Sequence, residues 1–216
     1  MMRSLTLVRH GESLWNALRI IQGHLDSPLS ETGRMQARAL AAALRGEERG
    51  AVFSSDLSRA METARLALGG AEGVIAEERL REQCFGRWQG LSPEDVRRSF
   101  PDEWSRYRAD PLTARPGGGE CVLDLRERVA GLLAEWHERL DGARVLVFTH
   151  GGVVRAAVMA ALGLPLVPWW RLRVPNASVT SLEFGADGAR LICFGSVGHL
   201  GEAAAGVAEE AGADGR

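Results

Sequence analysis

Short apolar runs alternate with longer helical patterns along most of this chain, and this alternation limits its possible folds. It is typical of α/β proteins, in which helices cover a mainly parallel sheet. We therefore expect a three-layer α/β sandwich built on a twisted, mainly parallel sheet. The predicted elements are strands at 4–8, 51–54, 73–76 and 144–148, helices at 30–45, 57–68, 122–140 and 151–162, and a hairpin at 179–184 and 189–194.

The composition changes between residues 86 and 119. Ser92 followed by Pro93 predicts the start of a helix, and further prolines and glycines divide the rest into short segments. We expect this stretch to form a small helical lid inserted over the sheet. The chain length suits one domain, which we expect to span residues 1–200. Residues 201–216 are rich in Ala, Gly and Glu without an apolar period, which predicts a disordered tail.

The overall charge and the cysteine pattern limit the classes of partner. The formal net charge of −2 provides no general attraction for nucleic acid or an anionic membrane, so neither is expected as a partner. The three cysteines (Cys84, Cys121 and Cys193) are widely spaced and odd in number, which argues against a disulfide framework. Because the start of the chain also lacks a signal-peptide pattern, we expect a cytoplasmic protein. The oligomeric state stays open, with a homodimer as one alternative.

Two distant places in the sequence look alike. One apolar run ends in Arg9-His10-Gly11, and another ends in Thr149-His150-Gly151. Ligands of open α/β sheets bind beyond the carboxyl ends of the strands, and a following helix N-terminus favours an anion. A single histidine at such a position is more often structural, but two matching junctions favour a functional site. They predict a phosphate pocket that contains His10, His150 and Arg9.

Two further residues are expected near the same edge of the sheet. Arg59 follows the predicted strand 51–54, at the start of a helix. Glu82 follows the short strand 73–76 and precedes the predicted lid. Taken alone, either residue would be interpreted as an ordinary solvated side chain. Their positions beside the two histidine junctions make them candidates for the site.

The run Leu7-Val8-Arg9-His10-Gly11-Glu12-Ser13-Leu14-Trp15-Asn16 resembles the opening signature of the histidine phosphatase superfamily, the phosphoglycerate mutase-like proteins. The similarity continues through Gln22-Gly23, through residues 26–37 and 54–64, and through Glu82 to the motif at 149–152. These segments cover most of residues 5–194 in the order of the family.

The resemblance implies a role for each candidate. His10 would accept the phosphoryl group, and Glu82 would donate the proton. The residues that it places around the phosphate are Arg9, Asn16, Gln22, Gly23, Arg59, His150 and Gly151. No metal or other cofactor is implied, and the two arginines would supply the fixed positive charge that phosphoryl transfer needs. Their guanidinium groups should also lower the pKa of His10 and keep its imidazole neutral.

The segment after Glu82 bears on the type of reaction. Residues 84–91 look like the FG-x-W-x-G pattern of the phosphatase branch, and the RHYG pattern of the mutases is absent. We therefore predict a metal-independent phosphomonoesterase that forms a phosphohistidine on His10 and hydrolyses a small-molecule phosphate ester. A cofactor-dependent phosphoglycerate mutase and a non-catalytic phosphate-binding or scaffold protein are the alternatives. The physiological substrate stays open among α-ribazole phosphate, sugar phosphates, nucleotides and phosphoproteins.

The remaining aromatic residues and histidines have weaker signals. The lid aromatics Trp88, Trp104 and Tyr107 would suit an uncharged or aromatic leaving group if they faced the site, or they form the core of the lid. The same question applies to Trp169 and Trp170. Of the other histidines, His24 is expected near the entrance, His137 on an exposed helix flank and His199 at the surface.

Overall fold

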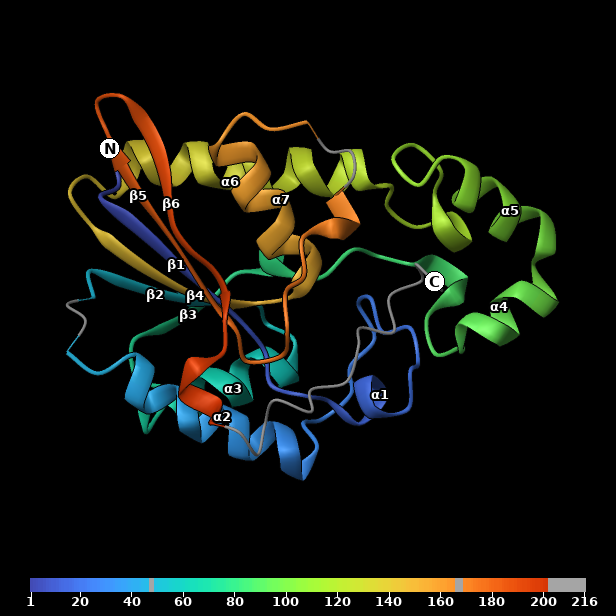
Figure 1. Ribbon diagram of the computed structural model, residues 1–216, viewed down its shortest axis with the longest axis horizontal. Helices are drawn as coiled ribbons and strands as arrows, with labels where there is room; N and C mark the ends of the chain where they lie inside the picture. The colour runs from blue at the N-terminus through green and yellow to red at the C-terminus, as the bar shows by residue number, and fades with distance from the viewer. Residues whose placement is uncertain (47–48, 166–168, 202–216) are drawn as a thin grey trace.

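The computed structural model describes residues 1–46, 49–165 and 169–201. Within them, six strands form one sheet in the order β3-β2-β4-β1-β5-β6. The strands are β1 (Ser4–Arg9), β2 (Ala51–Ser54), β3 (Val74–Ala76), β4 (Arg144–Thr149), β5 (Val179–Gly185) and β6 (Gly188–Ser196). The first four run parallel, whereas β5 and β6 form an antiparallel hairpin at one edge, as Figure 1 shows. The predicted strands are confirmed, with small differences at their ends.

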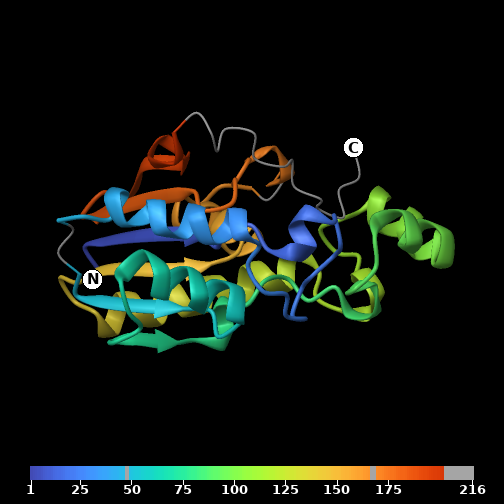
Figure 2. The ribbon, with the colours of Figure 1, turned by 90° about the horizontal axis from the view of Figure 1, so that it is seen from below.

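Helices cover both faces of the sheet, which confirms the three-layer α/β prediction (Figure 2). Helices α6 (Val122–Arg139) and α7 (Gly151–Ala161) lie on one face, and α2 (Glu31–Ala43) and α3 (Ser58–Leu68) on the other. Successive side chains of a strand point to opposite faces. In β4, Val145 and Val147 therefore pack with α6 and α7, whereas Leu146 and Phe148 pack with α2 and α3. Burial on both faces explains why β1 and β4 are almost uninterrupted apolar runs.

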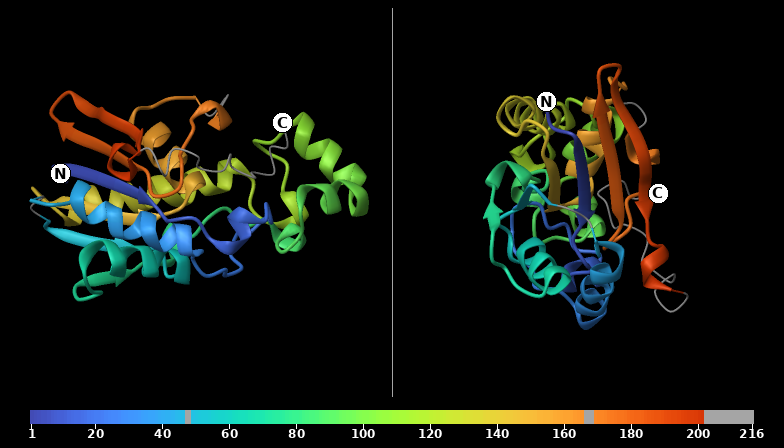
Figure 3. Two further views of the ribbon diagram at one scale, coloured as in Figure 1. Left: turned by 60° about the horizontal axis from the view of Figure 1, so that its bottom comes forward. Right: turned by 90° about the vertical axis from the view of Figure 1, so that its left-hand side faces the viewer.

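The predicted lid, residues 86–119, lies beyond the carboxyl end of the central strands (Figures 1 and 3). It consists of η2 (Gly86–Trp88), α4 (Pro93–Ser99), α5 (Pro101–Ala109) and η3 (Pro116–Gly118). The Ser92 side chain accepts a hydrogen bond from the Asp95 amide at 3.1 Å and caps α4, as predicted. The other short elements of the chain are α1 (Leu14–Ala17), η1 (Glu78–Leu80), η4 (Trp169–Arg171) and η5 (Gly198–Leu200).

Aromatic side chains hold the lid together from within. Trp88 is 0% exposed, and its ring lies 5.4 Å from that of Tyr107 and 5.8 Å from that of Trp104. A buried ring cannot contact a leaving group, so for Trp88 and Tyr107 the interpretation as lid core is correct and the substrate-facing one is wrong. Trp170 packs against the main core, and the side chain of Trp169 lies outside the described residues.

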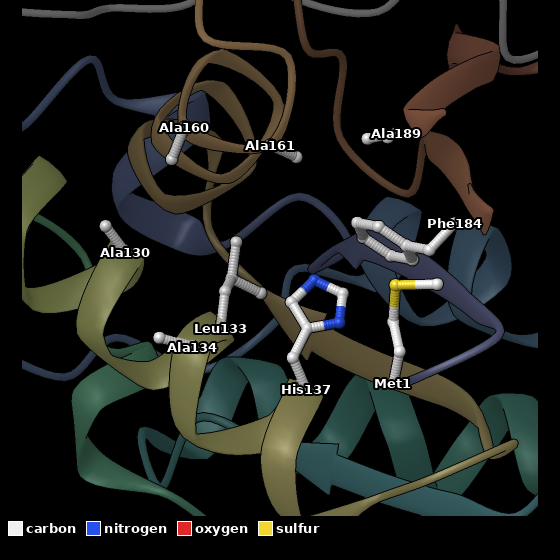
Figure 4. Close-up of a pocket in the computed structure, with 10 residues that line it drawn as sticks. Met1, Ala130, Leu133, Ala134, His137, Ala160, Ala161, Phe184 and Ala189 are labelled. Atoms are coloured by element: carbon white, nitrogen blue, oxygen red, sulfur yellow. The ribbon is translucent and has the colours of Figure 1, made fainter. Parts of the chain in front are cut away.

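His137 does not occupy the exposed flank that the sequence predicted. Its ring lies 4.4 Å from that of Phe184, edge to face, and lines a cavity of about 320 Å³ between α6, α7 and the β5–β6 hairpin (Figure 4). Burial and the nearby N-terminal amino group lower the pKa of His137. The periodicity of α6 is too coarse to predict this contact, because the partner belongs to a hairpin far along the chain. His199, expected at the surface, is half-buried.

Two further expectations concern the C-terminal tail and the membrane as a partner. The tail predicted to be disordered, residues 201–216, lies outside the described residues apart from Gly201. In the described part of the chain, no helix combines the length and the apolar character needed to cross a membrane.

The first turn of α2 touches the backbone that follows β1. Ser30 caps this helix by accepting a hydrogen bond from the Gly33 amide at 3.0 Å. A Cβ on Gly33 would lie 1.9 Å from the Glu12 carbonyl oxygen, and one on Gly11 would lie 2.4 Å from the Gly33 carbonyl oxygen. Both positions therefore require glycine, and this contact fixes the turn that leads out of β1.

We expect Gly33→Ala to destabilise the protein by about 1–3 kcal/mol, because the added methyl group displaces backbone rather than a flexible side chain. Gly131→Ala is the matched control, since Gly131 lies within α6 and a Cβ there meets no atom within 4 Å. That variant should gain about 0.5–1 kcal/mol from helix propensity. Urea unfolding of both variants measures the difference, and equal stabilities would contradict the tight contact.

Candidate active site

His10 follows β1 directly and is held by its backbone and by its ring. Its amide donates to the Thr149 carbonyl at 2.9 Å, and its carbonyl accepts from the Ala177 amide at 3.0 Å. Its Nδ1 lies 2.7 Å from the Gly11 carbonyl oxygen. Because a carbonyl can only accept, Nδ1 carries the proton, and in the neutral ring Nε2 carries the lone pair.

His150 lies beside His10 because of the strand register. Arg9 pairs with Thr149 in the parallel β1–β4 ladder, so the next residue of each strand is a histidine. The two ring centroids are 5.1 Å apart, and both side chains are buried. On its other side, Nε2 of His150 lies 2.9 Å from the Ser55 hydroxyl, which follows β2. The two histidine junctions therefore place their imidazoles in contact.

Two buried guanidinium groups complete this cluster. Arg9 is 7% exposed and donates to the Val174 carbonyl at 2.5 Å. Arg59, in the first turn of α3, is 1% exposed and donates to the carbonyls of Gly23 and Leu25 at 2.8 and 2.9 Å. Burial lowers the pKa of Arg59 to about 10, against the opposing charges of Glu82 and Asp26. The group therefore keeps its positive charge at neutral pH.

The electrostatics of the cluster keep both imidazoles neutral. Burial, and then the charges of Arg59 and Arg9, hold the pKa of His10 well below its ordinary value. Burial is also the main reason why the pKa of His150 is well below the ordinary value, with Arg59 as the next cause. A neutral His10 presents its Nε2 lone pair at physiological pH, as a nucleophile requires.

Glu82 reaches the same place from an irregular segment between η1 and η2. Its carboxylate accepts hydrogen bonds from the Gly152 amide at 3.1 Å and from the Gln83 amide at 2.9 Å. A Cβ on Gly152 would lie 2.2 Å from Oε1 of Glu82, so only glycine leaves room for this contact. Gly151 and Gly152 form the N-terminal turn of α7 directly after His150. This turn therefore binds the carboxylate through the backbone two residues after the second imidazole.

Other predicted residues form hydrogen bonds with Ser13 or with Arg59 of the cluster. Oδ1 of Asn16 accepts from the Ser13 amide at 3.1 Å, and Oε1 of Gln22 accepts from the Ser13 hydroxyl at 2.8 Å. Gly23 contributes the carbonyl that holds Arg59 and has a positive φ of 56°, where a Cβ would lie 2.1 Å from Oε1 of Gln89. His24, expected near the entrance, places Nε2 at 2.8 Å from the Glu82 carbonyl oxygen.

Three residues of the site were not singled out from the sequence. Ser55 contacts His150, Thr63 accepts from the Gly11 amide at 3.0 Å, and Nδ2 of Asn176 donates to the His10 carbonyl at 3.2 Å. The strand-to-helix junction at 54–59 is a signal that could have found Ser55. Asn176 has no such signal, since it precedes β5 in an irregular loop. In residues 1–46, 49–165 and 169–201, no group of three or more His, Cys, Asp or Glu side chains could hold a metal ion.

The buried histidines should make stability depend on pH. An unfolded histidine binds a proton near pH ~6.5, whereas the folded protein keeps His10 neutral well below that pH because its pKa is lowered. The unfolded chain therefore binds more protons, and stability falls as the pH drops below about 6.5. When the pH falls from 7.5 to 5.5, the unfolding free energy of the wild type should decrease. That of His10→Asn should decrease by about 1.4 kcal/mol less, because the variant lacks this histidine. Urea unfolding at both pH values tests this, and equal losses would contradict a neutral buried imidazole.

Comparison with known proteins identifies the family of this chain. The model of the histidine phosphatase superfamily (branch 1) matches residues 5–196. Phosphoserine phosphatase 1 of Hydrogenobacter thermophilus is 35% identical over 203 residues, covering 93% of this chain and 96% of that protein. Phosphoglycerate mutase-like protein 4 of Arabidopsis thaliana is 36% identical over 205 residues, covering 92% and 87%. The crystal structure of the alpha-ribazole phosphatase from Shigella flexneri has a TM-score of 0.84 at 28% identity, covering 90% of this chain and 96% of that one. The chain therefore belongs to the histidine phosphatase superfamily, as its motifs predicted.

Proposed function

We propose that this protein is a metal-independent phosphomonoesterase that transfers a phosphoryl group to His10 and then to water. The observation that carries the proposal is the state of His10: a buried, neutral ring whose Nδ1 proton is bound to the Gly11 carbonyl and whose neighbours are two buried guanidinium groups. This leaves Nε2 as a nucleophile beside fixed positive charge. Such charge stabilises the phosphoryl oxygens in the transition state without reorganisation.

In the first half-reaction, Nε2 of His10 forms a bond to phosphorus while the bond from phosphorus to the ester oxygen breaks. Glu82 enters this step as the protonated acid and gives its proton to the departing alkoxide. Arg9 and Arg59 balance the charge of the three remaining phosphoryl oxygens, and the one N–H of a neutral His150 can donate to them.

In the second half-reaction, the Glu82 carboxylate takes a proton from water while the water oxygen bonds to phosphorus. The phosphorus–nitrogen bond breaks, and its electron pair returns to Nε2 of His10. Inorganic phosphate leaves, and Glu82 is again protonated for the next cycle. One residue thus serves as acid and then as base.

Hydrolysis is favoured over mutase activity by the segment that follows Glu82. Phe85, Gly86, Trp88 and Gly90 complete the phosphatase-type pattern, and several relatives are named phosphatases, among them a metal-independent phosphoserine phosphatase of Arabidopsis thaliana. Other relatives are named mutases or mutase-like proteins. The substrates in these names make phosphoserine, α-ribazole phosphate and glucosyl-3-phosphoglycerate sensible members of a substrate panel.

His10→Ala should fold and lose at least about a thousandfold in kcat, because the variant lacks the nucleophile of the proposed first half-reaction. The assay measures phosphate release in EDTA from p-nitrophenyl phosphate and from the esters named above. Acid-labile phosphate on the wild-type protein, absent from the variant, would identify the intermediate. His137→Ala is the matched control, because His137 lines the cavity near the amino ends of the strands and should keep wild-type rates.

Three results would contradict the proposal in different ways. A His10→Ala protein with wild-type turnover would exclude the phosphohistidine. Conversion of 3-phosphoglycerate to 2-phosphoglycerate that depends on the bisphosphate would establish the mutase alternative. Phosphate binding without turnover of any ester would favour a non-catalytic role.

Glu82→Gln should slow hydrolysis of esters with poor leaving groups by about a hundredfold or more, because an alkoxide needs a proton to leave. The loss should be much smaller for p-nitrophenyl phosphate, whose phenolate leaves unprotonated. Initial rates with β-glycerophosphate and p-nitrophenyl phosphate measure the two losses. Equal losses would show that Glu82 does not act as the acid.

A further inference from the structure

The carboxylate of Glu82 is held by a backbone that has no regular structure. Residues 81–85 lie between η1 and η2 and belong to no helix or strand. In such a segment the peptide groups need partners elsewhere in the protein. Partners distant in the sequence are Arg128, Glu120 and the imidazole of His24, whose Nε2 lies 2.8 Å from the Glu82 carbonyl oxygen.

Arg128, in the middle of α6, uses all its N–H groups here. Its two terminal nitrogens donate to the carbonyls of Arg79 and Arg81 at 2.7 and 2.9 Å, and to the Glu82 carbonyl at 3.2 Å. The remaining two N–H groups donate hydrogen bonds to the Glu120 carboxylate at 2.9 and 2.8 Å. A guanidinium group has five N–H donors in a fixed plane, and each of them has an acceptor here.

Glu120 holds the other end of the same segment. Oε2 of its carboxylate accepts from the Cys84 amide at 2.9 Å, and its backbone carbonyl accepts from the Gln83 side chain at 2.7 Å. Its own amide donates to the Cys84 carbonyl at 2.8 Å. The Arg128–Glu120 pair is mostly buried, with 18% and 22% of the side chains exposed. An ion pair in such a place is firmly held, because separation leaves charges and carbonyls without partners.

We infer that Arg128, paired with Glu120, is a positioning residue that sets where the Glu82 carboxylate lies. This inference rests on the proposed function, in which Glu82 donates the proton. Arg128 touches the backbone of Glu82 and not its carboxylate, so it acts through that residue. A misplacement of about 1 Å can cost about a hundredfold in rate, so a loosened backbone should impair proton donation.

Arg79 provides a matched comparison. Its side chain also reaches α6, where it donates to Glu135 at 2.7 Å, and it pairs with Glu77 as well. Among the residues that the structure describes, its side chain makes no hydrogen bond or ion pair with residues 81–84, although its carbonyl accepts from Arg128. Replacing Arg79 therefore removes a comparable ion pair near the segment without removing the partners of the Glu82 backbone.

The experiment compares Arg128→Met with Arg79→Met in the full chain. Arg128→Met should lower kcat for β-glycerophosphate by about tenfold to a hundredfold and affect p-nitrophenyl phosphate by less than about threefold. Arg79→Met should leave both rates near wild type. In a Glu82→Gln background, Arg128→Met should cause little further loss, because two residues that act through one group are not additive. Equal losses on both esters, or losses that multiply in the double variant, would overturn the inference.

A second variant and a second measurement guard against a loss of folding. Glu120→Gln keeps the shape of the side chain but removes its charge, and it should shift the two ester rates in the same direction as Arg128→Met. Amide hydrogen exchange of Cys84 should accelerate by at least about tenfold in either variant and stay unchanged in Arg79→Met. Unchanged exchange in the Arg128 and Glu120 variants would overturn the inference. This readout needs no turnover, so an inactive wild-type protein would contradict the proposed function alone.

Discussion

The parallel pairing of β1 with β4 is the constraint on which the site depends. In this register Arg9 lies opposite Thr149, and the next residue of each strand is a histidine at the same edge of the sheet. The 5.1 Å separation of the two rings follows from this ladder and not from any local feature of either loop. A shift of the register would separate the imidazoles, and the buried apolar faces of both strands oppose such a shift.

The same edge concentrates positive charge on buried side chains. Arg9 and Arg59 are almost fully buried, and backbone carbonyls of residues 23, 25 and 174 accept hydrogen bonds from them. Carbonyl oxygens orient a guanidinium group without cancelling its charge, unlike a carboxylate in full contact. Asp26, one of the acids that face Arg59, lies 3.5 Å from its guanidinium group and is 45% exposed. The cluster therefore keeps net attraction for an anion while each arginine stays oriented.

The sequence predicted the parts of the site that lie at strand ends, because strand and helix periods are local. Arg9, His10, His150 and Arg59 all belong to this class. It did not predict Asn176 or the Arg128 contacts, whose partners lie in irregular segments and are chosen by three-dimensional packing. Whether the Trp88 ring faces the site or the core of the lid could not be predicted for a similar reason, since composition does not say which way a ring points. His137 was misplaced because a helix flank appears exposed until a hairpin from another part of the chain covers it.

Backbone atoms at the base of the lid contact the backbone of the segment that carries Glu82. A Cβ on Gly119 would lie 2.1 Å from the Cys84 carbonyl oxygen, and one on Gly86 would lie 2.1 Å from the Gly117 carbonyl oxygen. The outer helices α4 and α5 take no part in these contacts, and their aromatic core is separate from the main core. The lid thus has two parts: a base that packs against the backbone of the segment carrying Glu82, and an outer helix pair with a hydrophobic cluster of its own. A substitution within the outer pair can therefore change the far end of the lid without moving the backbone that carries Glu82.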